Sequence, residues 1–322
     1  MALQATAAQW ERLRSAEATL LAHIPVSITA HDIAIAGEQI HYLEAGDAKL
    51  PPLVLVHGRG SAAALWGPIL PQLAAHRHVF AVDMRGWGLS SRTPFTGTGG
   101  AEAIAWWRDG VLGVVDALGL TRFDLIGHSL GGMVSLSIAL ARGSQIDHLL
   151  LEDAAGFATT SPLDTRLYFA LEPERVAPLL PRPLFNIAAR GSVNIPNLTP
   201  AAKAAYADFV YTLTTFPGTR ASGARGFNTI LGVEGVRYTL LDQVHNVTPF
   251  TRAFWGVKDG VVPLNTSKAG IEMLPHGELV TFPNAMHSPH MEVPDVFARA
   301  ALEFLARGIE TPVNATPASA AE

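Results

Sequence analysis

The sequence predicts an α/β protein built on an open, mostly parallel sheet, with a mainly helical segment inserted between two of its strands. Three observations support this prediction. Short continuous apolar runs recur from residue 51 onward, helix-length amphipathic stretches separate them, and this alternation is lost between Phe157 and Thr248. Strands of a parallel sheet are buried on both faces, so they are continuously apolar rather than alternating.

The chain before residue 51 has a different pattern. Residues Glu11–His23 predict a short amphipathic helix, and the segments Ile28–Gly37 and Gln39–Gly46 alternate apolar with polar side chains. A period of two residues is typical of half-buried strands. We therefore expect residues 1–50 to form one helix and the first strands of the sheet.

The later apolar runs are expected to be the parallel strands. They are Leu53–Gly58, His78–Met84, Phe123–Ser129, His148–Ala154, Pro249–Gly256 and Gly277–Pro283. Among the intervening stretches, Trp106–Gly119 and Leu130–Arg142 have helical spacing. The prediction is a core of residues 51–156 and 249–308, a cap of residues 157–248, and a disordered tail rich in Pro, Ala and Thr over residues 309–322.

Composition narrows the class of function. The 322 residues are 48% hydrophobic and 16% charged, with a net charge of −5, which suits a chain with a large core and argues against nucleic acid as the main partner. The absence of cysteine excludes thiol nucleophiles and Cys-based zinc sites. No apolar stretch reaches about 18 residues and no signal peptide is apparent, so we expect a cytoplasmic protein without a transmembrane segment. Contact with a membrane surface stays open.

The sharpest motif is Gly127-His128-Ser129-Leu130-Gly131-Gly132, which directly follows an apolar run and precedes a helical pattern. In a G-x-S-x-G turn between strand and helix, the serine hydroxyl is exposed and side chains at the flanking glycines would collide with neighbouring backbone. Ser129 is therefore the expected nucleophile.

A serine hydroxyl needs a base to become a good nucleophile, and in this architecture the acid and then the base follow the serine along the chain. Asp259 follows one late apolar run and His287 follows the last one. We expect His287 to take the Ser129 proton and Asp259 to orient His287. Asp153 is the alternative acid, since it also ends a strand, and His290 is the alternative base. The two histidines as metal ligands would lack a third ligand nearby, so no metal or other cofactor is expected.

An oxyanion hole requires two backbone donors. The N–H of Leu130, immediately after the nucleophile, is the first candidate. The loop His57-Gly58-Arg59-Gly60 follows the first core strand, and its glycines permit close approach to a substrate, so the N–H of Arg59 is the second. The segment Asp83–Ser90 is expected to be a structural turn beside the site.

Together these blocks resemble the α/β-hydrolase superfamily, over about residues 53–155 and 249–305. The segments RLRSAEATLLAHIP, HGRGSAAALW and HLLLEDAAGF are also similar to a lipid-acting branch that contains lysophospholipases and a lysophosphatidate acyltransferase. That branch is associated with a His followed five residues later by Asp, but here Glu292 stands five residues after His287. The resemblance therefore implies hydrolysis more than acyl transfer. A serine rather than an aspartate as nucleophile also speaks against dehalogenase or epoxide hydrolase chemistry.

The inserted segment gives weaker guidance about substrate. Over Phe157–Phe250 it has eight Arg or Lys residues against six Asp or Glu, and it is rich in Phe and Tyr. These residues could form an apolar pocket with a slightly basic rim, but aromatic residues at helical spacing usually form core.

The expected function is cleavage of carboxylic esters, including lipid acyl esters, with a hydrophobic small molecule as substrate and an unknown oligomeric state. Two rivals remain open: a carbon–carbon bond hydrolase of vinylogous diketones that uses the same residues, and a ligand receptor on the same scaffold that does not turn over.

Overall fold

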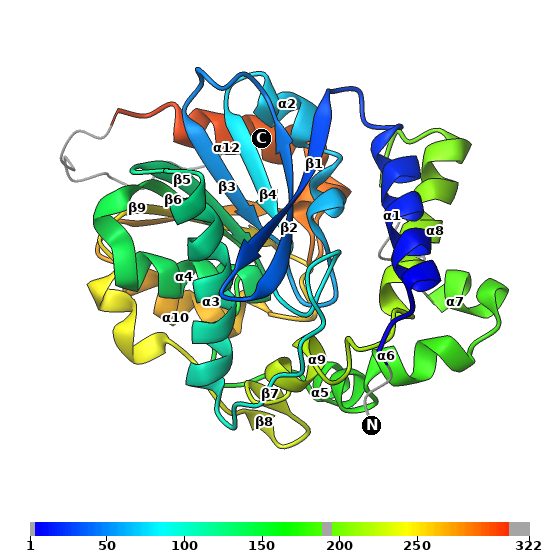
Figure 1. The fold of residues 1–322 in the computed structure, drawn as a ribbon. Helices are drawn as coiled ribbons and strands as arrows, with labels where there is room; N and C mark the ends of the chain where they lie inside the picture. Colours follow the sequence, from blue (N-terminus) through cyan, green and yellow to red (C-terminus); the bar gives the residue numbers. More distant parts are fainter. Residues whose placement is uncertain (1–3, 189–194, 309–322) are drawn as a thin grey trace.

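A computed structural model of the chain describes residues 4–188 and 195–308; the predicted disordered tail lies outside this range. The described residues form an eight-stranded sheet flanked by helices (Figure 1). The strands are β1 (Ile28–Ile35), β2 (Glu38–Ala45), β3 (Pro52–Val56), β4 (His78–Val82), β5 (Phe123–His128), β6 (Ile146–Glu152), β9 (Phe250–Gly256) and β10 (Gly277–Phe282).

The order of strands in the sheet is β1-β2-β4-β3-β5-β6-β9-β10. β2 pairs antiparallel with both β1 and β4, and the remaining pairs are parallel. The predicted α/β class and the mostly parallel sheet are thus confirmed. Each of the eight strands overlaps an apolar or alternating segment that the sequence indicated.

Helices cover both faces of the sheet, and side chains alternate between two cores. In β3, Val54 and Val56 contribute to one core while Leu53 and Leu55 contribute to the other. The first core also contains α3 (Gly100–Ala117) and α4 (Leu130–Arg142). The second contains residues of α1 (Ala7–Leu21), α2 (Leu70–Ala74) and α12 (Pro294–Leu305). Burial on both faces explains the continuous apolar runs.

Two helices begin earlier than their apolar spacing indicates, because polar side chains cap them. Thr6 and Gln9 form a reciprocal capping box at the start of α1. Before α3, the Glu102 carboxylate accepts the backbone N–H of Gly99 at 3.0 Å. Such caps satisfy N–H groups that have no partner inside the helix. The helix predicted over Leu130–Arg142 has those bounds in the structure.

The inserted segment lies between β6 and β9. Its described elements are α5 (Leu163–Ala170), α6 (Pro173–Val176), α7 (Arg182–Ala188), α8 (Pro200–Thr214), α9 (Gly223–Phe227), and the two short strands β7 (Leu231–Gly232) and β8 (Gly235–Val236). In Figure 1, α8 runs alongside α1 at the right, while α5, α9 and the β7–β8 hairpin lie together at the bottom of the view. Between the insert and the last helix, α10 (Leu264–Glu272) and α11 (Pro289–Glu292) follow β9 and β10 respectively.

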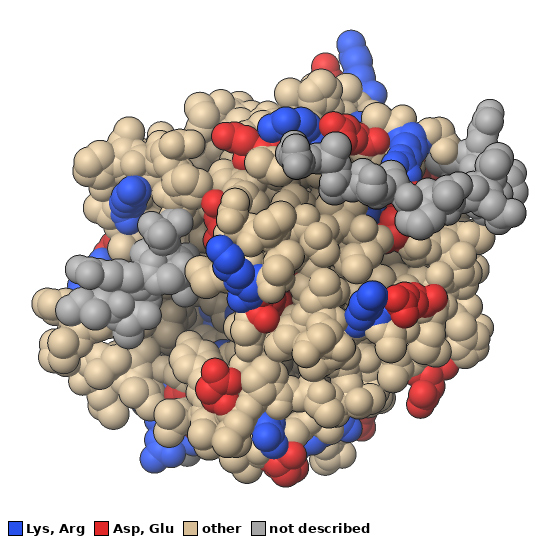
Figure 2. All heavy atoms as spheres, turned by 180° about the vertical axis from the view of Figure 1, so that it is seen from behind, with Lys and Arg blue, Asp and Glu red and all other residues tan. Residues whose placement is uncertain are grey.

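Charged groups are interspersed on one face of the molecule. On the face seen in Figure 2, apart from the atoms drawn in grey, cationic and anionic side chains are scattered and often adjacent. Within the described ranges, no helix is long and apolar enough to cross a lipid bilayer.

Candidate active site

Four of the predicted site residues follow the carboxyl ends of parallel strands, where open α/β sheets bind their ligands. Arg59 follows β3, Ser129 follows β5, Asp259 follows β9 and His287 follows β10. The topology therefore gathers at one edge of the sheet groups that are up to 228 positions apart in the sequence, since 287 − 59 = 228.

Ser129 occupies a strained turn. Its backbone has φ 54° and ψ −117°, a conformation that L-residues rarely adopt. A Cβ at Gly127 would lie 2.4 Å from the Gly131 carbonyl oxygen, and a Cβ at Gly131 would lie 2.2 Å from that of Val56. The turn therefore requires glycine at both positions, as the motif predicts.

His287 links the serine to an acid. Its Nε2 lies 3.0 Å from Ser129 Oγ, and its Nδ1 lies 2.9 Å from Asp259 Oδ2. The other Asp259 oxygen accepts the N–H groups of Val261 at 2.7 Å and Val262 at 3.0 Å. Burial alone would raise the pKa of Asp259, but the hydrogen bond and the charge of His287 hold it below its ordinary value. The chain Ser129–His287–Asp259 is the arrangement expected from the sequence.

Asp153, the alternative acid, lies beside Asp259 rather than on His287. Polar atoms of Asp153, Asp259 and His287 lie within 4.8 Å of one another, and Asp153 Oδ1 accepts the N–H of Gly256 at 2.9 Å. Burial, followed by the charge of Asp259, raises the pKa of Asp153 well above its ordinary value. Asp153 is thus the member of the carboxyl pair that holds its proton more tightly.

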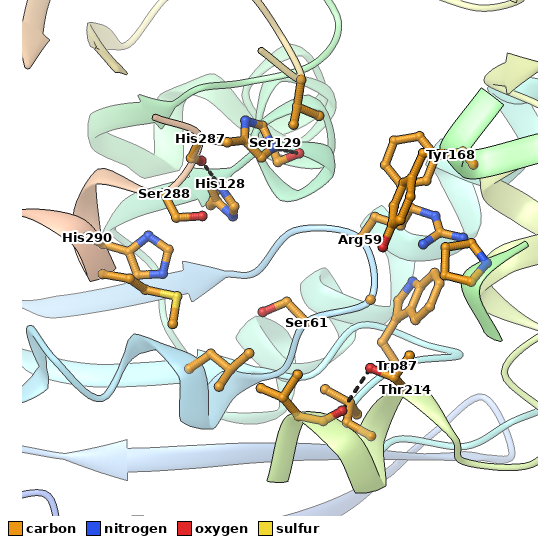
Figure 3. A pocket seen from close by; sticks show the side chains of 18 of the residues that line it. Arg59, Ser61, Trp87, His128, Ser129, Tyr168, Thr214, His287, Ser288 and His290 are labelled. Carbon is orange, nitrogen blue, oxygen red and sulfur yellow. Dashed lines mark hydrogen bonds between the residues drawn. The ribbon is translucent and has the colours of Figure 1, made fainter. Parts of the chain in front are cut away.

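His290, the alternative base, has a different partner. Its backbone N–H and its Nδ1 both lie 2.8 Å from Oε1 of the buried Glu152, and its ring packs on Trp66 with centroids 4.4 Å apart. Figure 3 shows His290 separated from Ser129 by His128 and Ser288. The geometry therefore favours His287 over His290 as the partner of the serine.

Both candidate oxyanion donors are available. Among the described residues, neither the Leu130 N–H nor the Arg59 N–H has a protein acceptor. A Cβ at Gly58 would meet His128 Nδ1 at 2.8 Å and Ser129 Cβ at 3.1 Å, so the loop after β3 runs directly against Ser129. The oxyanion assignment itself stays a proposal.

Two histidines that sequence reasoning left without a role hold this loop region. The Nε2 of His57 accepts the N–H of Met84 at 3.0 Å, and burial lowers the pKa of His57 to about 4, so the ring is neutral. His128 donates from Nε2 to the carbonyl of His287 at 2.7 Å, which leaves its Nδ1 toward Gly58. In the sequence, only their positions next to Gly58 and Ser129 indicated that His57 and His128 lie at the site.

The segment Asp83–Ser90 is the structural turn that the sequence predicts. The Asp83 carboxylate accepts the N–H groups of Ala63 and Leu89, each at 2.6 Å. A Cβ at Gly88 would lie 2.0 Å from that carboxylate, so only glycine fits. Trp87 from this turn reaches the wall of the site.

Three buried side chains of the kinds that bind metal ions also lie close together away from Ser129: Glu17 of α1, His41 of β2 and Asp83. His41 Nε2 lies 3.1 Å from Glu17 and its Nδ1 lies 2.9 Å from Asp32. Burial alone would lower the pKa of His41, but the hydrogen bonds to Asp32 and Glu17 raise it to about 10. Because both ring nitrogens carry protons, the group is an ion-paired cluster rather than a ligand set.

Two cavities open at Ser129. The large cavity, of about 280 Å³, is lined by His287, Ser288 and His290 from the core and by Tyr168 and Glu174 from the insert. The small cavity, of about 70 Å³, is mostly apolar and lies among Met133, Ala158, Phe227 and Ile230.

The aromatic residues of the insert divide between these walls and the core. Tyr168, Phe169 and Phe227 line the cavities, whereas Tyr206 and Phe209 pack into the second core. The basic rim expected from the insert is wrong for the described residues: among those that line the two cavities, the only Arg or Lys is Arg59, which belongs to the core. Insert arginines pair elsewhere, as Arg220 does with Glu172.

The comparisons with known proteins agree with this fold. The model of the alpha/beta hydrolase family matches residues 53–300. A 2-hydroxy-6-oxo-2,4-heptadienoate hydrolase of Pseudomonas putida is 30% identical over 273 residues, which cover 83% of this chain and 92% of that protein. A 1-acylglycerol-3-phosphate O-acyltransferase of Arabidopsis thaliana is 40% identical over 114 residues, but these cover only 35% of this chain and 27% of that protein.

Solved structures show the same fold. A carboxylesterase of Bacillus subtilis superposes with a TM-score of 0.71 at 18% identity, covering 94% of this chain and 99% of that one. A 2-hydroxy-6-oxo-6-phenylhexa-2,4-dienoate hydrolase of Rhodococcus has a TM-score of 0.74 at 24% identity, covering 88% and 100%. The protein therefore belongs to the alpha/beta hydrolase family, as the resemblance in its sequence implies.

Proposed function

We propose that this protein is a serine hydrolase that cleaves carboxylic esters through an acyl-enzyme. The observation that supports this most is the hydrogen-bonded series from Ser129 Oγ through His287 to Asp259, with distances of 3.0 Å and 2.9 Å. The series ends in a cavity beside the N–H groups of Arg59 and Leu130, neither of which has a protein acceptor among the described residues. Nucleophile, base, orienting acid and oxyanion donors are the parts that acyl transfer requires.

The reaction would proceed in two halves. Ser129 Oγ attacks the ester carbonyl carbon while its proton passes to His287 Nε2, and Asp259 stabilises the resulting imidazolium. The N–H groups of Arg59 and Leu130 would hold the oxyanion. The tetrahedral intermediate collapses to the acyl-enzyme as His287 protonates the departing alkoxide. Water, deprotonated by His287, then attacks the acyl carbon and releases the acid and the free Ser129 hydroxyl.

The charges around the cavities favour an ester over a dienoate. A dienoate carries a carboxylate, whose burial needs an unpaired cation or several hydrogen bonds. Among the described lining residues the one Arg or Lys is Arg59, and Glu174 neutralises it through a two-point ion pair. The other acid at the large cavity, Glu292, adds negative charge there.

Carbon–carbon bond hydrolysis is the second candidate. The Pseudomonas putida relative, which matches over most of its length, is named for a heptadienoate substrate. The same serine, histidine and aspartate would serve that reaction, so these three residues do not separate the two candidates, and the products of turnover do.

The insert would act as a cap, since Tyr168, Phe169 and Glu174 from it form part of the cavity wall. A lipid acyl ester is the finer form of the proposal, and its long acyl chain would have to lie in the large cavity, since the small one has a volume of only about 70 Å³. Activity that rises with acyl chain length would support it, and a short-chain optimum would indicate a general carboxylesterase.

The test is multiple-turnover hydrolysis of p-nitrophenyl esters from acetate to palmitate by the wild type and by Ser129→Ala. Ser144→Ala is the matched control, because Ser144 is exposed and lies at the opposite end of α4 from Ser129. We expect turnover in the wild type and the control, and a loss of at least about 10³-fold in Ser129→Ala. Turnover of a 2-hydroxy-6-oxo-dienoate without ester hydrolysis would support the second candidate. Ligand-dependent thermal stabilisation without any turnover would indicate a receptor.

A further inference from the structure

The side chain of Arg59 connects the core to the insert. Its Nη1 and Nη2 each lie 2.9 Å from one oxygen of Glu174, which belongs to α6. The two side chains are only 7% and 4% exposed. A two-point contact of this kind fixes both position and orientation, and burial makes each charge depend on the other.

The other close neighbours of the Arg59 guanidinium are aromatic rings, whose faces attract a cation but do not neutralise its charge. The Arg59 guanidinium lies over the rings of Phe169 at 4.6 Å, Phe227 at 5.0 Å and Trp87 at 5.6 Å. Its Nε is buried and has no acceptor among the described residues. Figure 3 shows the guanidinium beside Tyr168 and Trp87. Glu174 is therefore the group that neutralises Arg59.

Arg59 stands where the two cavities meet, and Glu174 lines the large one. Arg59, Ser129, Phe169 and Val261 line both of them. A carbonyl carbon at Ser129 Oγ would therefore have one substituent in each cavity. Apart from Arg59, the described lining of the small cavity contains no Asp, Glu, Lys or Arg, and its volume of about 70 Å³ suits a short chain.

We propose that the Arg59–Glu174 pair is a specificity determinant that admits short uncharged acyl groups to the small cavity and excludes anionic ones. This inference rests on the proposed ester hydrolysis. An acyl carboxylate that entered the small cavity would lose its hydration and find a cation whose charge is already matched by Glu174. An apolar chain of the same length would lose only unfavourable contact with water.

The experiment compares two esters of similar length, p-nitrophenyl pentanoate and mono-p-nitrophenyl glutarate, at pH 7.5. Rates are corrected for spontaneous hydrolysis with Ser129→Ala, and the readout is the ratio of kcat/KM for glutarate to that for pentanoate. We expect the wild type to favour pentanoate by at least about tenfold. Glu174→Gln leaves the Arg59 cation unmatched, so the ratio should rise at least about tenfold.

Two further variants show whether the change comes from the freed cation. Arg59→Met combined with Glu174→Gln removes both charges and should return the ratio to that of the wild type. Glu172→Gln is the matched control, because Glu172 lies two residues away in the same segment and pairs with Arg220 outside these two cavities. Its ratio should equal that of the wild type.

The outcomes separate this inference from the proposed function. A wild type that prefers glutarate, or a Glu174→Gln enzyme that cleaves pentanoate with an unchanged ratio, would overturn the inference and leave ester hydrolysis intact. A lower overall rate with a raised ratio still supports it, since the ratio does not depend on the amount of folded enzyme. Absence of turnover on both esters would overturn the proposed function and the inference together.

Discussion

Glu292 holds the loop of His287 from both sides, because its carboxylate accepts the backbone N–H groups that flank the histidine. Oε2 accepts the N–H of Met286, and Oε1 accepts that of Ser288 at 3.2 Å. The sequence marks this position only as a departure from the acyltransferase-like pattern. The structure gives the residue a mechanical role, which is to fix the backbone that carries His287.

Removal of that carboxylate should therefore lower activity. Hydrogen bonds to a charged acceptor contribute about 1.5–3 kcal/mol. We expect Glu292→Ala to lower kcat/KM for a p-nitrophenyl ester by about 10- to 100-fold, and Glu292→Gln, which keeps one acceptor oxygen, to lose less. Glu303→Gln on the exposed side of α12 is the control. Wild-type rates in both Glu292 variants would contradict this role.

The two neighbouring acids should respond differently to amide substitution. Asp259→Asn removes the charge that orients His287, so we expect kcat to fall by about 10³- to 10⁴-fold. Asp153→Asn should retain activity within about threefold, because an amide can accept from Gly256 and donate toward Asp259 as a neutral carboxyl does. Steady-state kinetics of the two variants decide the point, and equal losses would mean that Asp153 shares the acid role.

Asp153 also predicts a pH dependence of stability. A carboxyl whose pKa is raised in the folded state binds a proton more tightly there than in the unfolded chain, so it costs stability as pH rises above its ordinary pKa near 4. Asp153→Asn removes that cost. The free energy of unfolding in urea should therefore increase relative to wild type more at pH 8 than at pH 5. An equal effect at both values would show that Asp153 is ionised in the folded protein.

His41 should produce a loss of stability at alkaline pH. Its pKa is raised from 6.5 to about 10 in the folded state, so its stabilising contribution is fully present below pH 6.5 and is lost as pH rises toward 10. Full release of one proton gives a slope of up to about 1.4 kcal/mol per pH unit. Urea unfolding between pH 7 and 9.5 measures it. His41→Gln should flatten this slope, and a slope that persists unchanged in the variant would assign it to other groups.

The strained turn at Ser129 gives a prediction about stability that is independent of catalysis. Gly131→Ala places a methyl group 2.2 Å from the Val56 carbonyl oxygen, so we expect a loss of more than about 3 kcal/mol or failure to fold. Gly119→Ala is the control. Gly119 has φ 68° with no atom within 4 Å of an added Cβ, so only the backbone strain of about 1–2 kcal/mol should appear. Similar losses in both variants would contradict the steric argument.

Much of the fold could be predicted because local signals agree with burial. Runs such as Leu53–Gly58 are apolar because both faces of a central strand are covered. Every consecutive residue of such a strand must therefore be apolar, and this pattern is visible in the sequence. Thr6 and Gln9 cap α1, so the helix begins four residues before Glu11, where apolar spacing alone places its start. The strained turn at Ser129 was predictable because a G-x-S-x-G motif between strand and helix is typical of that backbone conformation.

Partners far apart in the chain could not be predicted in the same way. The sequence by itself determined the class, the parallel sheet and the strand–turn–helix motif at Ser129, because each depends on spacing within a few residues. It also indicated Asp259 and His287 as the candidate acid and base. Only the tertiary structure decided that His287 rather than His290 contacts Ser129. It also decided that Asp153 lies against Asp259. Arg59 pairs with Glu174, which is 115 positions away in the sequence. The reason is physical. Which charges meet in a buried site depends on how strands and insert pack, and no local pattern encodes that packing.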